Sequence, residues 1–150
     1  MEDPYDLQRF VAAQEPVYEQ VCAELRQGRK LTHWMWFVFP QFEGLGRSDM
    51  AQRYAIGSRS EAQAYLAHPL LGERLRECAR LVNAVEGRSA REIFGDPDDL
   101  KFHSSMTLFA WLHGDSAVFS EALTRYFSGR LDRRTLELLE GEKPAPPRKN

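Results

Sequence analysis

His33-Trp-Met-Trp-Phe-Val-Phe-Pro-Gln41 is a run of aromatic and bulky apolar side chains between one histidine and one glutamine. It is too short to span a bilayer, because a membrane helix needs about 20 apolar residues. We therefore expect it to belong to the core and to form one wall of a pocket. Each indole carries an N–H that needs a partner when it is buried, so a segment used only for packing would be built from Leu or Phe. The two tryptophans therefore favour a binding site.

The segment 33–39 fits a helix better than a strand. Thr32 is a suitable N-cap for a helix that begins at His33. The density of aromatic and β-branched residues also fits a buried strand of this length. However, no other segment shows the clear alternation that would supply a partner strand, and an isolated strand leaves its backbone groups unpaired. The sequence therefore favours a helix, followed after Pro40 by a glycine-containing loop over 41–48.

Amphipathic helices dominate the remaining chain. The clearest apolar stripe has spacings of 4, 3, 4 and 3 residues and consists of Leu71, Leu75, Cys78, Val82 and Val85. Further helix starts are indicated by capping patterns at Asp3-Pro4, Ser58-x-x-Glu61, Ser89-x-x-Glu92, Asp96-Pro97 and Asp132. The pattern predicts an all-α fold, a single compact domain of seven to nine short helices in an irregular, orthogonal array over residues 1–141. The segment 142–150 has three prolines and no apolar period, so we expect a mobile tail.

Length and charge narrow the classes of function. A chain of 150 residues is long enough for one domain with a substantial core. Its 43% hydrophobic and 28% charged residues are typical of a globular protein. The net charge of −2 gives no electrostatic reason to expect nucleic acid or an acidic membrane as a partner. We therefore predict no nucleic-acid partner, no membrane partner and, by default, a monomer.

The cysteines, the histidines and the N-terminus exclude further classes. Cys22 and Cys78 are 56 positions apart without CxxC or Cys/His metal spacing, so reduced core thiols are favoured over a disulfide. The N-terminal Met-Glu-Asp-Pro-Tyr-Asp lacks the features of a secretory signal, so we expect a cytoplasmic protein. We expect neither a metal nor a cofactor, because no i, i+4 pair occurs among the four histidines, His33, His68, His103 and His113.

Two segments suggest a site for a planar, negatively charged ligand. If Trp34, Trp36 and Gln41 face a cavity, the indoles would stack on a ring and the amide would pair with a base or carboxamide edge. The plainer alternative is an aromatic core closed by a turn. In Gly44-Leu-Gly-Arg-Ser48, backbone N–H groups and the Arg47 guanidinium could converge on a phosphate. An ordinary loop is the alternative, because the spacing is neither that of a P-loop nor that of a dinucleotide fingerprint.

A third segment, residues 101–107, places an amine, an imidazole and three hydroxyls on the first turns of an expected helix. On that helix Lys101 and Ser104 or Ser105 share one side, whereas His103 faces another. A serine activated by the lysine or by an imidazole would be a nucleophile. We take Lys101, His103 and Ser105 as the candidate catalytic residues. The structural alternative is that the hydroxyls bond to carbonyls one turn back and that the lysine pairs with an aspartate or with solvent.

Several motifs together resemble one bacterial family, the domain-of-unknown-function family 1810. Besides the stretch 33–41, they are Gly44-Leu-Gly-x-Ser48, Tyr54-Ala-Ile56, Glu61-Ala-x-Ala-Tyr-Leu-x-His-Pro-x-Leu-Gly72, Ile93-Phe-Gly-x-Pro-Asp-Asp-x-Lys-Phe102 and Ser104-Ser-Met-Thr-Leu-Phe109. The resemblance covers residues 7–139 and implies a compact all-helical fold, with no implied activity. The label calpastatin that such proteins sometimes carry does not fit, because an inhibitor of that class is a long, low-complexity, disordered chain.

The neighbourhoods of Glu61-Ala and Lys101-Phe are also similar to those of helical proteins that act on ADP-ribose derivatives. Our first hypothesis is therefore a pocket for a nucleotide or ADP-ribose-like small molecule, with metal-independent hydrolase or transferase activity. Its ligand-binding residues would be Trp34, Trp36, Gln41 and Arg47. The second hypothesis is a non-catalytic module that binds a protein through an exposed aromatic patch. A concave pocket with convergent polar groups favours the first hypothesis, whereas a flat apolar patch or fully buried indoles argue against it.

Overall fold

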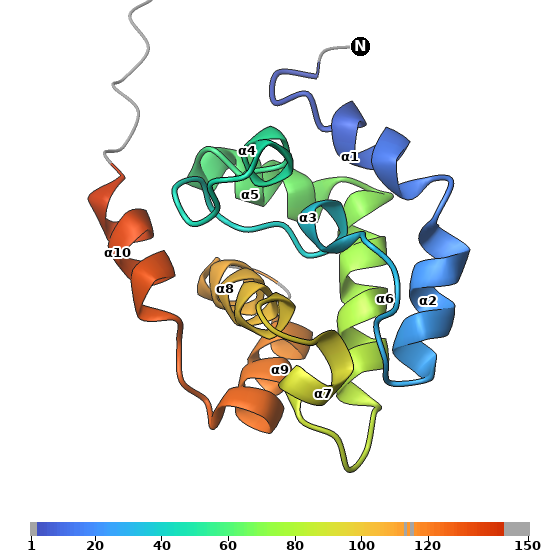
Figure 1. The fold of residues 1–150 in the computed structure, drawn as a ribbon. Helices are drawn as coiled ribbons and strands as arrows, with labels where there is room; N and C mark the ends of the chain where they lie inside the picture. Colours follow the sequence, from blue (N-terminus) through green and yellow to red (C-terminus); the bar gives the residue numbers. More distant parts are fainter. Residues whose placement is uncertain (1–2, 113, 115, 143–150) are drawn as a thin grey trace, which may run out of the picture.

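The structure, a computed structural model, describes residues 3–112, 114 and 116–142, which form an array of helices (Figure 1). In chain order these are α1 (Gln8–Gln14), α2 (Tyr18–Arg26), α3 (Met35–Val38), α4 (Asp49–Arg53), α5 (Arg59–Ala67), α6 (Leu71–Asn83), α7 (Ala90–Phe94), α8 (Asp98–Trp111), α9 (Ala117–Phe127) and α10 (Arg133–Gly141). The predicted all-α single domain is confirmed. The count of ten over the described residues includes α3, α4 and α7, which have only four or five residues each.

No helix within the described ranges combines the length and the apolar composition that crossing a membrane requires. Apart from Glu142, the tail predicted for 142–150 lies outside the described residues, and so does His113.

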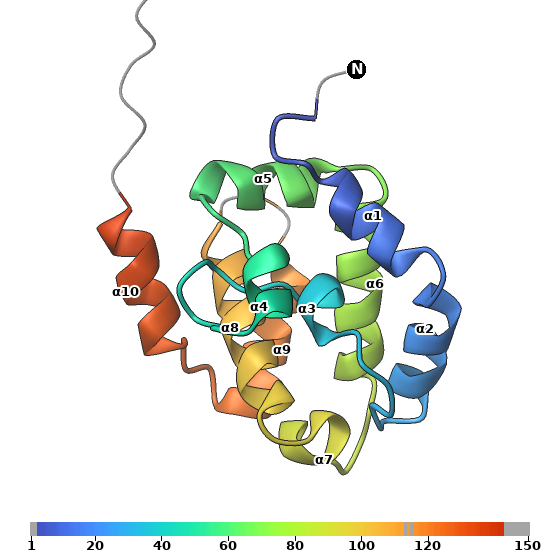
Figure 2. The same ribbon diagram turned by 45° about the horizontal axis from the view of Figure 1, so that its top comes forward.

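The central element of the array is α8. In Figures 1 and 2 it lies between α10 on one flank and α6 on the other, with α9 beside it and α2 on the far side of α6. Its predicted apolar face is confirmed, because Phe102, Met106 and Phe109 are fully buried. Ser105 and Thr107 are fully buried as well. A helix with neighbours on several sides hides most of its residues, which explains why α8 is apolar over so much of its surface.

The aromatic stretch 33–41 forms a shorter helix than its sequence predicts. α3 covers only Met35–Val38, with Trp34 at the N-cap position, and Thr32 does not cap it. The Thr32 hydroxyl instead donates a hydrogen bond to Glu24 of α2 at 2.6 Å. The reason is tertiary: the buried Glu24 carboxylate accepts hydrogen bonds from the backbone N–H groups of Leu31 and Thr32, which holds this loop in a non-helical conformation.

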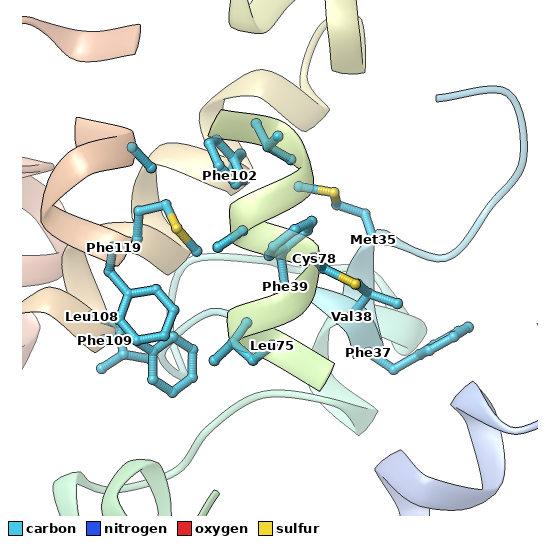
Figure 3. Close-up of a cluster of buried hydrophobic side chains, with 14 of the residues drawn as sticks. Met35, Phe37, Val38, Phe39, Leu75, Cys78, Phe102, Leu108, Phe109 and Phe119 are labelled. Carbon is cyan, nitrogen blue, oxygen red and sulfur yellow. The ribbon is translucent and has the colours of Figure 1, made fainter. Parts of the chain in front are cut away.

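After α3 the chain inserts aromatic rings into the centre of the fold. Figure 3 shows Phe39 among side chains of α6 and α8, whereas Phe37 points away from that group. Phe39 packs edge-on against Phe102, with ring centroids 5.0 Å apart, and Phe37 packs against Tyr54 at 5.4 Å. The expectation that this stretch belongs to the core is therefore confirmed. The Phe42–Ile56 contact is an isolated parallel β-bridge.

Three of the five predicted capping patterns mark the start of a helix, those at Ser58, Ser89 and Asp132. Ser89 and Glu92 form the predicted capping box, and the Asp132 side chain caps α10 by accepting from the Thr135 N–H. Ser58 caps α5, but the Glu61 carboxylate bonds to the Gly57 N–H and to Arg9 in place of the Ser58 N–H. The predicted N-caps Asp3 and Asp96 are both wrong. α1 begins only at Gln8, with Leu7 at its N-cap position, and the Asp3 carboxylate accepts from the N–H groups of Leu7 and Gln8. The N-cap of α8 is Pro97, which follows a cis peptide bond.

A close backbone contact at the α5–α6 junction leads to a first testable prediction. A Cβ atom on Gly72 would overlap the backbone carbonyl oxygen of Leu66, which is not a flexible side-chain end. Gly-to-Ala in a helix ordinarily stabilises by roughly 1 kcal/mol. We expect Gly72→Ala to reverse that sign and to lower the free energy of unfolding by about 1–3 kcal/mol, because overpacking shifts backbone. Urea unfolding followed by circular dichroism measures the change.

Gly141 provides the matched control for this substitution. It is the last residue of α10, and a Cβ atom there would meet nothing within 4 Å. Gly141→Ala should leave stability unchanged or raise it by up to about 1 kcal/mol. Equal effects of the two substitutions would contradict the close approach of α6 to Leu66.

Candidate functional site

A groove lies where the loop after α3 meets the start of α8 and the start of α10. Its volume is about 300 Å³, and its lining consists of Gln41, Leu45, Gly46, Pro97, Leu100, Lys101, Ser104, Asp132 and Arg134. A second, water-sized cavity of about 10 Å³ shares Gln41, Gly46 and Lys101 with the groove and adds Trp36 to the lining. The two spaces therefore adjoin, and together they form one candidate site that three separate chain segments build.

The loop that carries Gln41 is held by backbone hydrogen bonds and by close packing. The Ile56 N–H donates to the Gln41 carbonyl at 2.9 Å, and the Glu43 N–H donates to the Ile56 carbonyl at 2.8 Å. Gly46 must be glycine, because a Cβ atom would overlap that of Ala51 in α4. Gly44, with φ +103°, would place a Cβ atom 3.4 Å from Leu138 of α10. The Gly-Leu-Gly spacing thus allows the loop to pass between α4 and α10.

Lys101 lies at the junction of the groove and the small cavity. Its ammonium nitrogen is 5.6 Å from the centroid of the Trp36 ring and 3.6 Å from Asp98. The same Asp98 carboxylate also pairs with Lys30 at 2.9 Å. One carboxylate therefore pairs with two ammonium groups. The distance to Trp36 is that of a cation–π contact.

Ser104 and Asp132 form another part of the lining. The Ser104 hydroxyl lies within hydrogen-bonding distance of two acceptors, the Leu100 carbonyl at 3.1 Å and Asp132 Oδ2 at 3.2 Å. Asp132 Oδ2 also accepts from the N–H and the hydroxyl of Thr135. Within the described part of the chain the hydrogen bonds of this carboxylate fall on Oδ2, and none falls on Oδ1. The Asp132 N–H donates to the Thr107 hydroxyl at 2.8 Å, which fixes the start of α10 against α8.

Of the seven site residues that the sequence suggested, the structure brings together Trp36, Gln41 and Lys101. Trp34 is elsewhere, because it is 1% exposed and its indole N–H donates to Glu24 Oε1 at 2.9 Å. The rule that a buried indole needs a partner is therefore satisfied by a core carboxylate. Arg47 is exposed and does not line either space. The loop around it forms the start of α4, where Ser48 accepts from the Ala51 N–H.

The other two predicted catalytic residues also lie away from the groove. His103 stacks on Phe127, with ring centroids 4.0 Å apart, and its Nε2 is 2.7 Å from the Arg130 carbonyl. Ser105 is fully buried, and its hydroxyl has no hydrogen-bond partner among the described residues. The structural alternative for this segment is present too, because the Thr107 hydroxyl donates to the His103 carbonyl at 2.9 Å. The orientation of α8 about its own axis explains where these residues lie. It turns Lys101 and Ser104 towards the groove and leaves His103 and Ser105 on other faces of the helix.

Sequence reasoning missed two charged residues of the groove, and it left open which of two serines belongs to it. Ser104 and Ser105 were alternatives for the side of Lys101, and the groove contains Ser104. Asp132 carried only the signal of a helix cap, which it is. Arg134 carried no signal, because nothing in its local sequence shows that α10 returns to α8. The described residues contain no group of three or more His, Cys, Asp or Glu side chains that could hold a metal ion.

The fold and the groove define a compact all-helical protein with a surface groove beside its central helix. The chain belongs to the DUF1810 family, described as proteins of unknown function, whose model matches residues 4–139. It is similar to the conserved hypothetical protein Rv1873 from Mycobacterium tuberculosis, with 60% sequence identity and a TM-score of 0.92 over 93% of this chain and 100% of that chain. The comparison with curated proteins finds no match. The resemblance seen in the sequence motifs is confirmed, and it assigns no activity.

Proposed function

We propose that this protein binds a small anionic molecule of the nucleotide or ADP-ribose type in the groove. The observation that supports this most is convergence: Gln41, Lys101 and Arg134 come from three separate segments and line one cavity of about 300 Å³. Ligand sites for small molecules begin at about this volume and combine apolar walls with a few polar groups. The groove has both, since Leu45, Pro97 and Leu100 also line it.

The chemistry of the lining suits each part of such a ligand. Lys101 and Arg134 supply positive charge for a phosphate, and a guanidinium can bind two phosphate oxygens at once. The Gln41 amide offers both a donor and an acceptor to the edge of a base. Asp132 Oδ1 can accept from a ribose hydroxyl. The apolar side chains pack against the ring of the ligand.

Any reaction in this groove would use the groups that line it. Lys101 is the candidate acid or base, and Arg134 would hold negative charge. Ser104, hydrogen-bonded to Asp132, takes the place that sequence reasoning gave to Ser105. The activity that these groups support is hydrolysis or group transfer without a metal ion.

The alternative function, a non-catalytic module that binds a protein, is supported by a different observation. Leu100 is 59% exposed and borders the groove, and Leu31 and Leu131 are 58% and 43% exposed. Because Trp34 is buried, such a surface would be aliphatic and not the aromatic patch that the sequence suggested.

A thermal-shift experiment tests the proposed ligand. We expect ADP, NAD or ADP-ribose to raise the melting temperature of the protein, because a ligand at a hundredfold its dissociation constant adds about 2.7 kcal/mol to stability. Gln41→Ala, Lys101→Ala and Arg134→Ala should each reduce the shift, since each removes one contact with the ligand.

Arg133→Ala is the matched control, because Arg133 precedes Arg134 but its side chain is 93% exposed and pairs with Glu137 at 3.8 Å. It should bind as the unmodified protein does. A shift that persists in Arg134→Ala and Lys101→Ala would move the ligand out of the groove. No shift with any of the three compounds would favour the protein-binding alternative.

A further inference from the structure

The packing of α2 on α6 brings together the two cysteines of the chain, which are 56 positions apart in the sequence. Both helices are visible side by side in Figures 1 and 2. Cys22 Sγ lies 3.8 Å from the Glu77 carboxylate, at the turn of α6 that carries Cys78. The Cys22 and Cys78 thiols are within hydrogen-bonding reach of each other, and the Tyr18 hydroxyl contacts both. These groups lie outside the proposed ligand site.

The two thiols have opposite electrostatic environments. The hydrogen bond from Cys78 lowers the pKa of Cys22 to about 7, against the opposing effects of burial and of Glu77. The same hydrogen bond raises the pKa of Cys78, and its complete burial raises it further. Cys22 is therefore more readily ionised at neutral pH than an ordinary cysteine, which is only a few per cent thiolate. A low-pKa cysteine beside a second thiol is the arrangement of redox-sensing cysteines.

We propose that Cys22 and Cys78 are a redox modification site, in which a hydroperoxide oxidises Cys22 and Cys78 resolves the product to a reversible intramolecular disulfide. The Cys22 thiolate attacks one peroxide oxygen, the O–O bond breaks, and a sulfenic acid forms while the leaving oxygen takes a proton to become water or an alcohol. The Cys78 sulfur then attacks Cys22 Sγ, the S–O bond breaks, and the hydroxyl leaves with the Cys78 proton as water. Two electrons pass from the thiols to the peroxide.

The two cysteines differ in their exposure to solvent. Cys22 is 4% exposed, whereas Cys78 is completely buried. A small, uncharged oxidant such as hydrogen peroxide is therefore expected to meet Cys22 first. Because the resolving thiol comes from the neighbouring helix, the disulfide would tie α2 to α6 without a second protein molecule.

The test is oxidation of the intact chain by a modest excess of hydrogen peroxide at pH 7. We expect loss of both alkylatable thiols, a non-reduced peptide that links Cys22 to Cys78 in mass spectrometry, and full recovery of the thiols with dithiothreitol. Cys78→Ser should stop at a sulfenic acid on Cys22 that dimedone traps. In the reduced protein, alkylation of Cys22 should be at least about tenfold faster than that of Cys78, because the thiolate fractions and exposures differ in the same direction.

Three results would overturn the proposal. Retention of both thiols after peroxide treatment would show that the native pair does not react. Equal alkylation rates for the two cysteines would indicate that reaction occurs only through unfolding. A disulfide found only between two chains would show that Cys78 is not the resolving group. The variant Cys22→Ala, which keeps a small apolar side chain, should lose peroxide sensitivity while its circular dichroism spectrum stays that of a folded protein.

Discussion

Glu24→Ala is expected to lower the free energy of unfolding by roughly 3–5 kcal/mol, because four hydrogen-bond donors, among them the buried Trp34 indole, lose their shared acceptor. Glu24 is 1% exposed. Its carboxylate accepts from the backbone N–H of Leu31 at 2.7 Å, from both donors of Thr32, and from the Trp34 indole at 2.9 Å. Removing it would leave the loop before α3 without the contacts that hold its conformation. Urea unfolding followed by tryptophan fluorescence measures the loss.

Two further substitutions separate this effect from a general loss of charge on α2. Glu24→Gln keeps one acceptor oxygen, so we expect a smaller loss of about 1–3 kcal/mol. Glu19→Ala removes an exposed carboxylate from the same helix and should change stability by less than about 0.5 kcal/mol. If Glu24→Ala were as mild as Glu19→Ala, the hydrogen-bond network around Trp34 would not exist in solution.

Because Glu24 is ionisable, its contribution to stability depends on pH. Burial raises the pKa of Glu24, but the hydrogen bonds from Thr32, Leu31, Gln20 and Trp34 outweigh it and lower the pKa from 4.5 to about 2. A group whose pKa is lower in the folded state stabilises the fold above its unfolded pKa. That contribution, roughly 3 kcal/mol, is lost as the pH falls from about 5 to 2. Glu24→Gln should remove this part of the acid destabilisation, and an unchanged pH profile would contradict the assignment.

The sequence predicts the helical class and several helix starts because these depend on local signals. The stripe from Leu71 to Val82 and the capping box at Ser89 act within a few residues of chain, and the structure confirms them. At Thr32 a group on another helix overrides the local signal. Thr32 fails as a cap because Glu24, eight residues earlier, accepts its hydroxyl hydrogen bond. The sequence around Thr32 does not show that Glu24 will accept this hydrogen bond.

The candidate site is less accessible to sequence reasoning, since its residues meet only through tertiary packing. Gln41 and Lys101 stand out by composition, and both line the groove. Which serine accompanies Lys101 depends on the rotation of α8, and Arg134 enters only because α10 returns to that helix. Trp34 is a residue that sequence reasoning wrongly included. Its indole N–H suggested a ligand, but a core carboxylate accepts its hydrogen bond.

The second large effect is expected at the aromatic centre of the fold. Phe102 is fully buried on α8. Its ring stacks on Phe94 at 4.6 Å and meets the edge of Phe39 at 5.0 Å. Truncating such a ring removes its burial and leaves a cavity, which costs about 3–5 kcal/mol. We therefore expect Phe102→Ala to lower the free energy of unfolding by that amount, as measured by urea denaturation.

Leu100→Ala is the matched control on the same helix. Leu100 is 59% exposed, so its truncation should cost less than about 1 kcal/mol. A double-mutant cycle between Phe102→Leu and Phe39→Leu should show a coupling of about 0.5–1.5 kcal/mol, because the two rings are in edge-to-face contact. Additive effects would indicate that the rings do not touch. Since Phe102 follows Lys101 on α8, the cluster that stabilises the core also fixes one wall of the groove, and ligand-induced stabilisation should fall in Phe102→Leu even where the protein remains folded.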